Sequence, residues 1–160
     1  MTEASAEAIE TALATWLDNS TLVRLQTEPG ENLCIEIPIK GITLRGWFIC
    51  LVSGYVLLVP LGLELGPEDH LDMSRLMAAI NGVHPFGSFD FNPDADDVSL
   101  RITAFVADAA HVEGIQPDVM GWARSALRSY STLFRAVADK LLTVDDAITK
   151  VKDSNDDEDD

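Results

Sequence analysis

Apolar residues recur at two different periods along this chain, and the changes of period divide it into elements. A helical spacing of about 3.6 residues occupies residues 3–18 and 68–81, and a long helical stretch begins near Pro117. Alternating or continuous apolar runs, the pattern of strands, lie between the helical stretches. These runs cover residues 21–27, 33–39, 42–52 and 55–61, and two shorter ones surround Phe89 and Leu100.

The order of these elements predicts a single α+β domain at residues 1–150. It reads helix, antiparallel strands, helix, two strands and a long C-terminal helix. Thr143 and Asp146 resemble a capping box, which predicts a short additional helix. We expect residues 151–160 to form a disordered acidic tail, because six of the last eight residues are Asp or Glu.

Residues 46–63 contain no charged side chain, and their 18 positions approach the length of a membrane span. Ser53 and Gly54 interrupt the stretch with a turn signal, and Pro60 would weaken a helix there. We therefore interpret the stretch as two buried strands joined by a tight hairpin, and we do not expect it to enter a membrane.

The strand at 42–52 is apolar on both of its faces. Leu44 and Phe48 alternate toward one face, which we take as the core. The opposite face of this strand and of the strand around Leu100 carries Trp47, Ile49, Leu51, Arg101 and Phe105. Because one face of an antiparallel sheet normally meets water, an apolar second face needs a cover. One of the chain's own helices, a second subunit or a bound partner would each serve, so these residues are candidate partner-binding residues.

The charge balance bears on the choice of partner. The chain carries 27 acidic and 11 basic residues, a net charge of −16. Such a chain repels phosphate backbones and anionic lipid, so we expect neither a nucleic acid nor a membrane as partner. The one concentrated positive stripe is Arg124, Arg128 and Arg135 on the long helix. It is either a solvated face or a docking site for an acidic partner segment or the chain's own tail, so Arg124 and Arg128 join the candidates.

Patterns of known catalytic or metal sites are missing from the sequence. The histidines and cysteines share no ligand spacing, and there is no nucleophile elbow or phosphate-binding loop. Residues 90–97 imitate a calcium loop, but Ala95 and Arg101 stand where that loop needs Gly and Glu. We predict a protein that is not an enzyme and has no cofactor and no metal; weak cation binding at residues 90–97 stays open.

Cellular location follows from two further observations. The N-terminus is acidic and has no apolar core of a secretory signal, and Cys34 and Cys50 fit buried thiols of a reducing compartment. We therefore expect a cytoplasmic protein.

Three short segments carry a resemblance to known proteins: Leu76-Met-Ala-Ala-Ile-Asn81, Phe86-Gly-Ser-Phe89-Asp-Phe91 and Asp97-Val-Ser-Leu100-Arg101. With the order of elements, they resemble the type III secretion chaperones and the related YbjN family of bacterial regulators. The resemblance covers residues 3–142. It implies an acidic, usually dimeric, non-enzymatic protein that holds another protein or acts in regulation, and it carries over no catalytic residues.

These observations lead to one functional hypothesis and two alternatives. We expect a chaperone-like or regulatory protein-binding module that acts as a homodimer, with a client segment adding along a strand edge. A small-ligand sensor or small enzyme, with a pocket between the sheet and the C-terminal helix, is the first alternative. An accessory subunit of a larger assembly, with the tail as an electrostatic arm, is the second.

Overall fold

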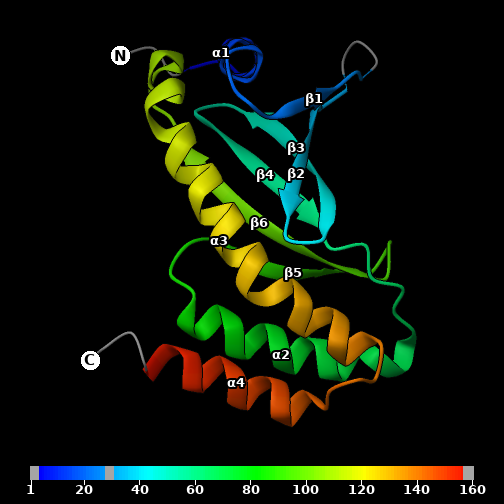
Figure 1. Ribbon diagram of the computed structural model, residues 1–160. Helices are drawn as coiled ribbons and strands as arrows, with labels where there is room; N and C mark the ends of the chain where they lie inside the picture. Colours follow the sequence, from blue (N-terminus) through cyan, green and yellow to red (C-terminus); the bar gives the residue numbers. More distant parts are fainter. Residues whose placement is uncertain (1–3, 28–30, 157–160) are drawn as a thin grey trace.

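The computed structural model describes residues 4–27 and 31–156. The expected start of the first helix at residue 3, residues 28–30 of the expected turn at 28–32, and residues 157–160 of the expected tail lie outside the described residues. Four α-helices and six strands form the described chain (Figure 1). The helices are α1 (Ala6–Asp18), α2 (His70–Val83), α3 (Val112–Ala138) and α4 (Val144–Asp156). The strands are β1 (Val23–Leu25), β2 (Leu33–Ile39), β3 (Ile42–Leu51), β4 (Gly54–Pro60), β5 (Ser88–Asn92) and β6 (Asp97–Phe105).

The strands form one antiparallel sheet in the order β1-β2-β3-β4-β6-β5. The predicted α+β class is therefore confirmed. The uncharged stretch at 46–63 contains most of the β3–β4 hairpin, whose turn places Ser53 at φ 61°. Within the described residues, no helix is both long and apolar enough to cross a membrane.

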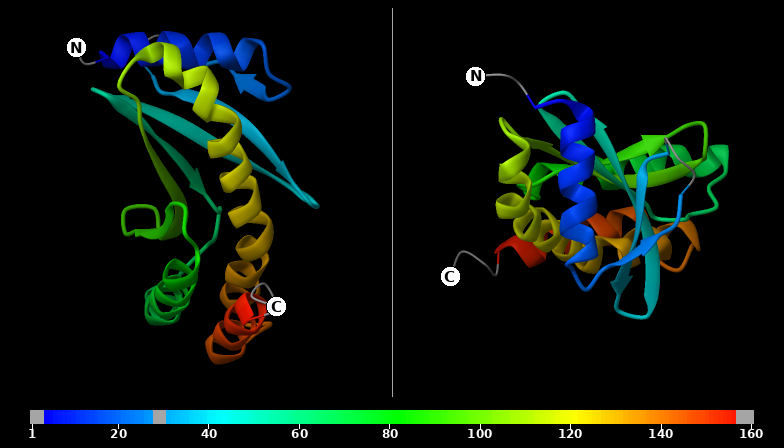
Figure 2. Two further views of the ribbon diagram at one scale, coloured as in Figure 1. Left: turned by 90° about the vertical axis from the view of Figure 1, so that its left-hand side faces the viewer. Right: turned by 90° about the horizontal axis from the view of Figure 1, so that it is seen from above.

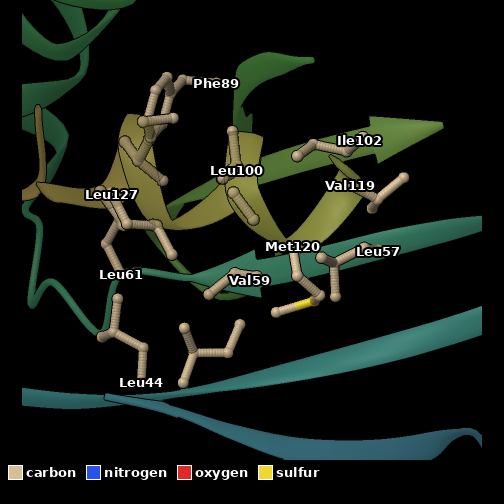
Figure 3. Packing of buried hydrophobic residues seen from close by; sticks show 14 of the residues in the cluster. Leu44, Leu57, Val59, Leu61, Phe89, Leu100, Ile102, Val119, Met120 and Leu127 are labelled. Atoms are coloured by element: carbon tan, nitrogen blue, oxygen red, sulfur yellow. The ribbon is translucent and has the colours of Figure 1, made fainter. Parts of the chain in front are cut away.

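The helices divide into two groups around the sheet. In the left-hand view of Figure 2, α3 runs along one side of the sheet, α1 crosses one end, and α2 and α4 lie beyond the other end. Apolar side chains of α1 and α3 pack against the sheet, which buries their shared face. The close view in Figure 3 shows the centre of this core: Leu57 and Val59 of β4, Leu100 and Ile102 of β6, and Val119, Met120 and Leu127 of α3.

The start of α3 and the end of α4 differ from the sequence prediction. The α3 helix begins at Val112, five residues before Pro117, because Asp108 caps a 3-10 turn (Ala109–His111) that leads directly into it. Pro117 therefore lies inside the helix, past its first turn, where it has no N–H to donate to the carbonyl oxygen of Glu113. The last helix, α4, continues to Asp156, well into the expected disordered tail, because its buried face holds it on the domain through Ala147 and Val151.

The helix predicted to start at Thr143 is confirmed as α4, with one half of the capping box formed: Asp146 meets the Thr143 hydroxyl in place of the Thr143 backbone N–H. The Thr143 hydroxyl donates to Asp146 Oδ2 at 2.7 Å and accepts from the Asp146 backbone N–H at 3.2 Å.

Asn81 joins α2 to the outer edge of β5. The sequence pattern predicts that Asn81 and Gly82 end the helix, whereas α2 continues to Val83. The Asn81 side chain lies beside Phe89, accepting from its N–H at 2.8 Å and donating to its carbonyl oxygen at 2.9 Å. Both backbone groups at the centre of this edge strand are therefore occupied, which disfavours the addition of a client strand here.

We expect Asn81→Ala to lower the free energy of unfolding by about 1–3 kcal/mol, because Phe89 loses two backbone hydrogen bonds in a partly buried place. Urea unfolding followed by circular dichroism measures the change. Gly82→Ala is the matched control in the same turn: a Cβ at Gly82 meets no atom within 4 Å, so this variant should be as stable as the wild type or slightly more so. Equal stability of both variants would contradict this role for Asn81.

Candidate interaction surface

The face of the sheet away from α1 and α3, here called the outer sheet face, has an apolar centre. The strand register places Leu25, Cys34 and Trp47 side by side across β1, β2 and β3, and Leu58 of β4 continues the row. Ile49 and Val56 form the next row, and Leu51 and Phe105 flank Gly54 in the last. The structure thus brings four of the predicted residues together on one continuous surface: Trp47, Ile49, Leu51 and Phe105.

The two faces of the sheet differ sharply in exposure. On the inner face Phe48, Tyr55 and Leu57 are fully buried, whereas Leu51 is 46% and Phe105 86% exposed on the outer face. Trp47 and Ile49 are half-buried, which neighbouring side chains of the same face account for. Within the described residues, α1 and α3 pack on the inner face, so an intramolecular cover by either helix is excluded. A second subunit or a bound partner stays open.

Gly54 explains why the Phe105 side chain is so exposed. A Cβ at Gly54 would lie 2.4 Å from the carbonyl oxygen of Ala104, so the close approach of β4 and β6 requires glycine here. Because Gly54 is the cross-strand neighbour of Phe105, the ring has no side chain beside it on β4. Its exposure follows from this backbone contact, and any larger residue at position 54 would disturb the β4–β6 pairing.

Charge on the outer sheet face is balanced, unlike the charge of the whole chain. Arg101 donates from Nε to Asp90 Oδ2 at 2.7 Å, and Glu36 lies directly across from Arg45 in the β2–β3 register. The two acidic and two basic residues border the apolar centre. This face can therefore approach another surface without the repulsion expected of a chain with a net charge of −16.

The low exposure of Cys34 shows that the side chains around it on the outer sheet face pack closely. Although it points to this face, its side chain is only 4% exposed, and the register puts Leu25 and Trp47 on either side of it. Burial raises the pKa of the Cys34 thiol. Cys50 faces inward, and burial raises its pKa to about 11. Both thiols are therefore poor nucleophiles near neutral pH.

The other candidate residues, Arg124 and Arg128, lie on α3, which covers the opposite side of the sheet. The structure does not bring them together with Trp47. Arg135, on the same stripe, donates to the backbone oxygen of Leu61 at 3.1 Å and so fixes α3 to the end of β4. Sequence reasoning left out Val56 and Leu58, although the two-sided apolar pattern of β4 was the signal that could have found them.

Three of the four acidic residues at 90–97 make contacts between elements. Asp90 pairs with Arg101, and Asp96 Oδ1 lies 3.1 Å from His70 Nε2. The buried Asp97 accepts from the backbone N–H groups of Gly62 and Leu63, each at 2.9 Å. The described part of the chain contains no group of three side chains arranged to hold a metal ion.

The interior between the sheet and α3 is filled by the apolar core (Figure 3). A pocket of about 480 Å³ lies at its rim, beside Lys40 and Arg128.

Comparisons of the chain with protein-family models, with curated proteins and with solved structures gave no match. The likeness to type III secretion chaperones and the YbjN family therefore stays a prediction.

We expect Trp47→Ala to increase the alkylation rate of Cys34 by iodoacetamide several-fold, because the indole shields the thiol across the β2–β3 register. Peptide mass spectrometry of dilute protein at pH 8 separates Cys34 from Cys50. Leu71→Ala is the control, since Leu71 is 71% exposed on α2 and lies outside the sheet. An unchanged Cys34 rate in the Trp47 variant would show that the indole does not cover this part of the face.

Proposed function

We propose that this chain is a non-enzymatic protein-binding module that forms a homodimer through the outer sheet face. The observation that carries the proposal is the uncovered apolar surface around Trp47, Ile49 and Phe105. Aromatic residues with a surrounding polar rim are typical of the centre of a protein interface. If no partner covered it, an exposed apolar patch of this kind would promote aggregation.

The choice of a second copy as the occupant rests on charge and size. A two-fold interface brings the same patch of both subunits together, so the patch must complement itself. The pairs Asp90–Arg101 and Glu36–Arg45 leave the face near neutral, with both signs at the border of the apolar centre. Four strands about 4.8 Å apart and seven residues long present roughly 500 Å² in projection. This is of the same order as the roughly 800 Å² of accessible surface that each partner buries in a standard interface.

The finer part of the proposal is a chaperone-like or regulatory protein of the cytoplasm, similar to the YbjN family. It is supported by the order of elements, by the acidic composition and by the Asn81–Phe89 contact, which links two of the segments that carry the resemblance. Because Asn81 occupies the centre of the β5 edge, the partner is held on a face of the domain and not along this edge.

Phe105→Glu tests the dimer. Because the ring is 86% exposed, a carboxylate there should leave the subunit folded but place two like charges near the interface. We expect the dissociation constant to rise at least thirtyfold, about the effect of losing 2 kcal/mol at an interface hot spot. Sedimentation velocity over a concentration series measures it.

Leu141→Glu is the matched control, because Leu141 is 79% exposed between α3 and α4, away from the sheet. It should sediment as the wild type does. A monomeric wild type at tens of micromolar, or a Phe105→Glu variant that stays dimeric, would contradict the homodimer.

A further inference from the structure

The pocket at the rim of the core lies between the tip of the β2–β3 hairpin and the middle of α3. Its volume is about 480 Å³, and Ile39, Lys40, Arg128 and Thr132 line it. Figure 1 shows the turn between β2 and β3 beside α3. Ile39 is buried and gives the pocket an apolar floor, while Lys40 and Arg128 are exposed at its border.

The charges around this pocket distinguish it from two other hollows of the described residues. The hollow between α3 and α4 has Asp153 beside Lys150, and the one at the start of α4 has Asp72 and Asp146 beside Lys140. Among the described residues, the wall of the hairpin pocket has two basic residues and no acidic one. On a chain with 27 acidic residues, two basic side chains around one apolar floor are a local reversal of charge.

Within residues 4–27 and 31–156, neither Lys40 nor Arg128 forms an ion pair. The ion pairs of the described residues engage Arg24, His70, Arg75, Arg101 and Lys140. Neither Lys40 nor Arg128 belongs to one of these pairs. Both therefore keep their charge available to an incoming carboxylate.

We propose that this pocket binds a short acidic segment of a partner protein, with carboxylates on Lys40 and Arg128 and an apolar side chain on Ile39. Arg128 offers a planar fork that suits a carboxylate, and Lys40 adds a mobile point charge. Repulsion from the rest of the chain is screened beyond about 8 Å at physiological salt, so contacts within the pocket decide binding. A long polyanion such as nucleic acid would have to cross the acidic surface around the pocket, which favours a protein segment.

This proposal specifies the kind of partner that the proposed binding module takes. Binding in the pocket does not require the homodimer. Lys40 and Arg128 lie where the β2–β3 turn meets α3, on the helix-covered side of the sheet. A homodimer formed through the outer sheet face leaves this pocket open in both subunits.

Fluorescence anisotropy tests the proposal with a fluorescein-labelled peptide of Asp and Glu residues around one central Leu. A companion peptide carries Asn and Gln in place of the acids. We expect the acidic peptide to bind and the companion not to, and we expect Arg128→Glu and Lys40→Glu each to weaken binding about tenfold. The matched control is Lys152→Glu, which makes the same change of net charge at an exposed position of α4 outside the pocket wall.

Four outcomes would overturn the proposal: equal weakening by Lys152→Glu, equal binding of the companion peptide, tighter binding of a single-stranded DNA oligonucleotide, or no binding of the acidic peptide. A fifth concerns the chain's own C-terminal segment. If a chain that ends at Ser154 binds the peptide much more tightly than the full chain, the chain's own acidic residues fill the pocket and the partner assignment is wrong.

The same variants separate this proposal from the homodimer. Arg128→Glu should sediment as the wild type does, and Phe105→Glu should keep its affinity for the acidic peptide. Loss of peptide binding in Phe105→Glu would place the peptide on the outer sheet face and contradict the pocket.

Discussion

The structure depends on burying one face of a six-stranded antiparallel sheet under α1 and α3. Ile9 and Leu13 of α1 and Ala123 and Leu127 of α3 are fully buried there. Burial of each Leu or Ile side chain among them contributes about 1.5–3 kcal/mol. Because α1 and α3 are used on this face, and α2 and α4 lie beyond one end of the sheet (Figure 2), no described helix covers the other face. The apolar character of Trp47 and Phe105 then calls for a partner from outside the subunit.

Polar contacts fix how the helices and connections sit on that core. Tyr55 donates its hydroxyl to Gln116 Oε1 at 2.7 Å, which ties the first turns of α3 to the middle of the sheet, and burial raises the Tyr55 pKa. Asp97 holds the chain where it leaves β4, and Asn81 holds β5 against α2. The Tyr55 and Asp97 contacts join residues distant in sequence, and the Asn81 contact joins neighbouring elements. All three leave the outer sheet face to apolar residues and balanced charges.

Local patterns were enough to predict the strands and their faces. Alternation along 42–52 placed Trp47, Ile49 and Leu51 together correctly, because period 2 fixes the side of a strand that each residue occupies. Long-range contacts escaped this reasoning. The periodicity of apolar residues does not indicate that β6 lies between β4 and β5 in the sheet. Nor does it indicate that Lys40, at the tip of a hairpin, lies beside the same pocket as Arg128 of α3. The start of α3 was missed because Pro117 is a strong local start signal, while the Asp108 cap is a weaker one.

The most direct test of the outer sheet face as a dimer interface is a ¹⁹F NMR dilution series of protein labelled with 5-fluorotryptophan. The chain has three tryptophans. Trp47 lies on the outer sheet face, Trp16 lies on α1, and Trp122 of α3 stacks on Phe86. Trp16 and Trp122 are therefore internal controls. We expect the Trp47 resonance alone to shift as the protein is diluted. Three resonances that stay unchanged over the whole range, or a shift confined to Trp16 or Trp122, would contradict it.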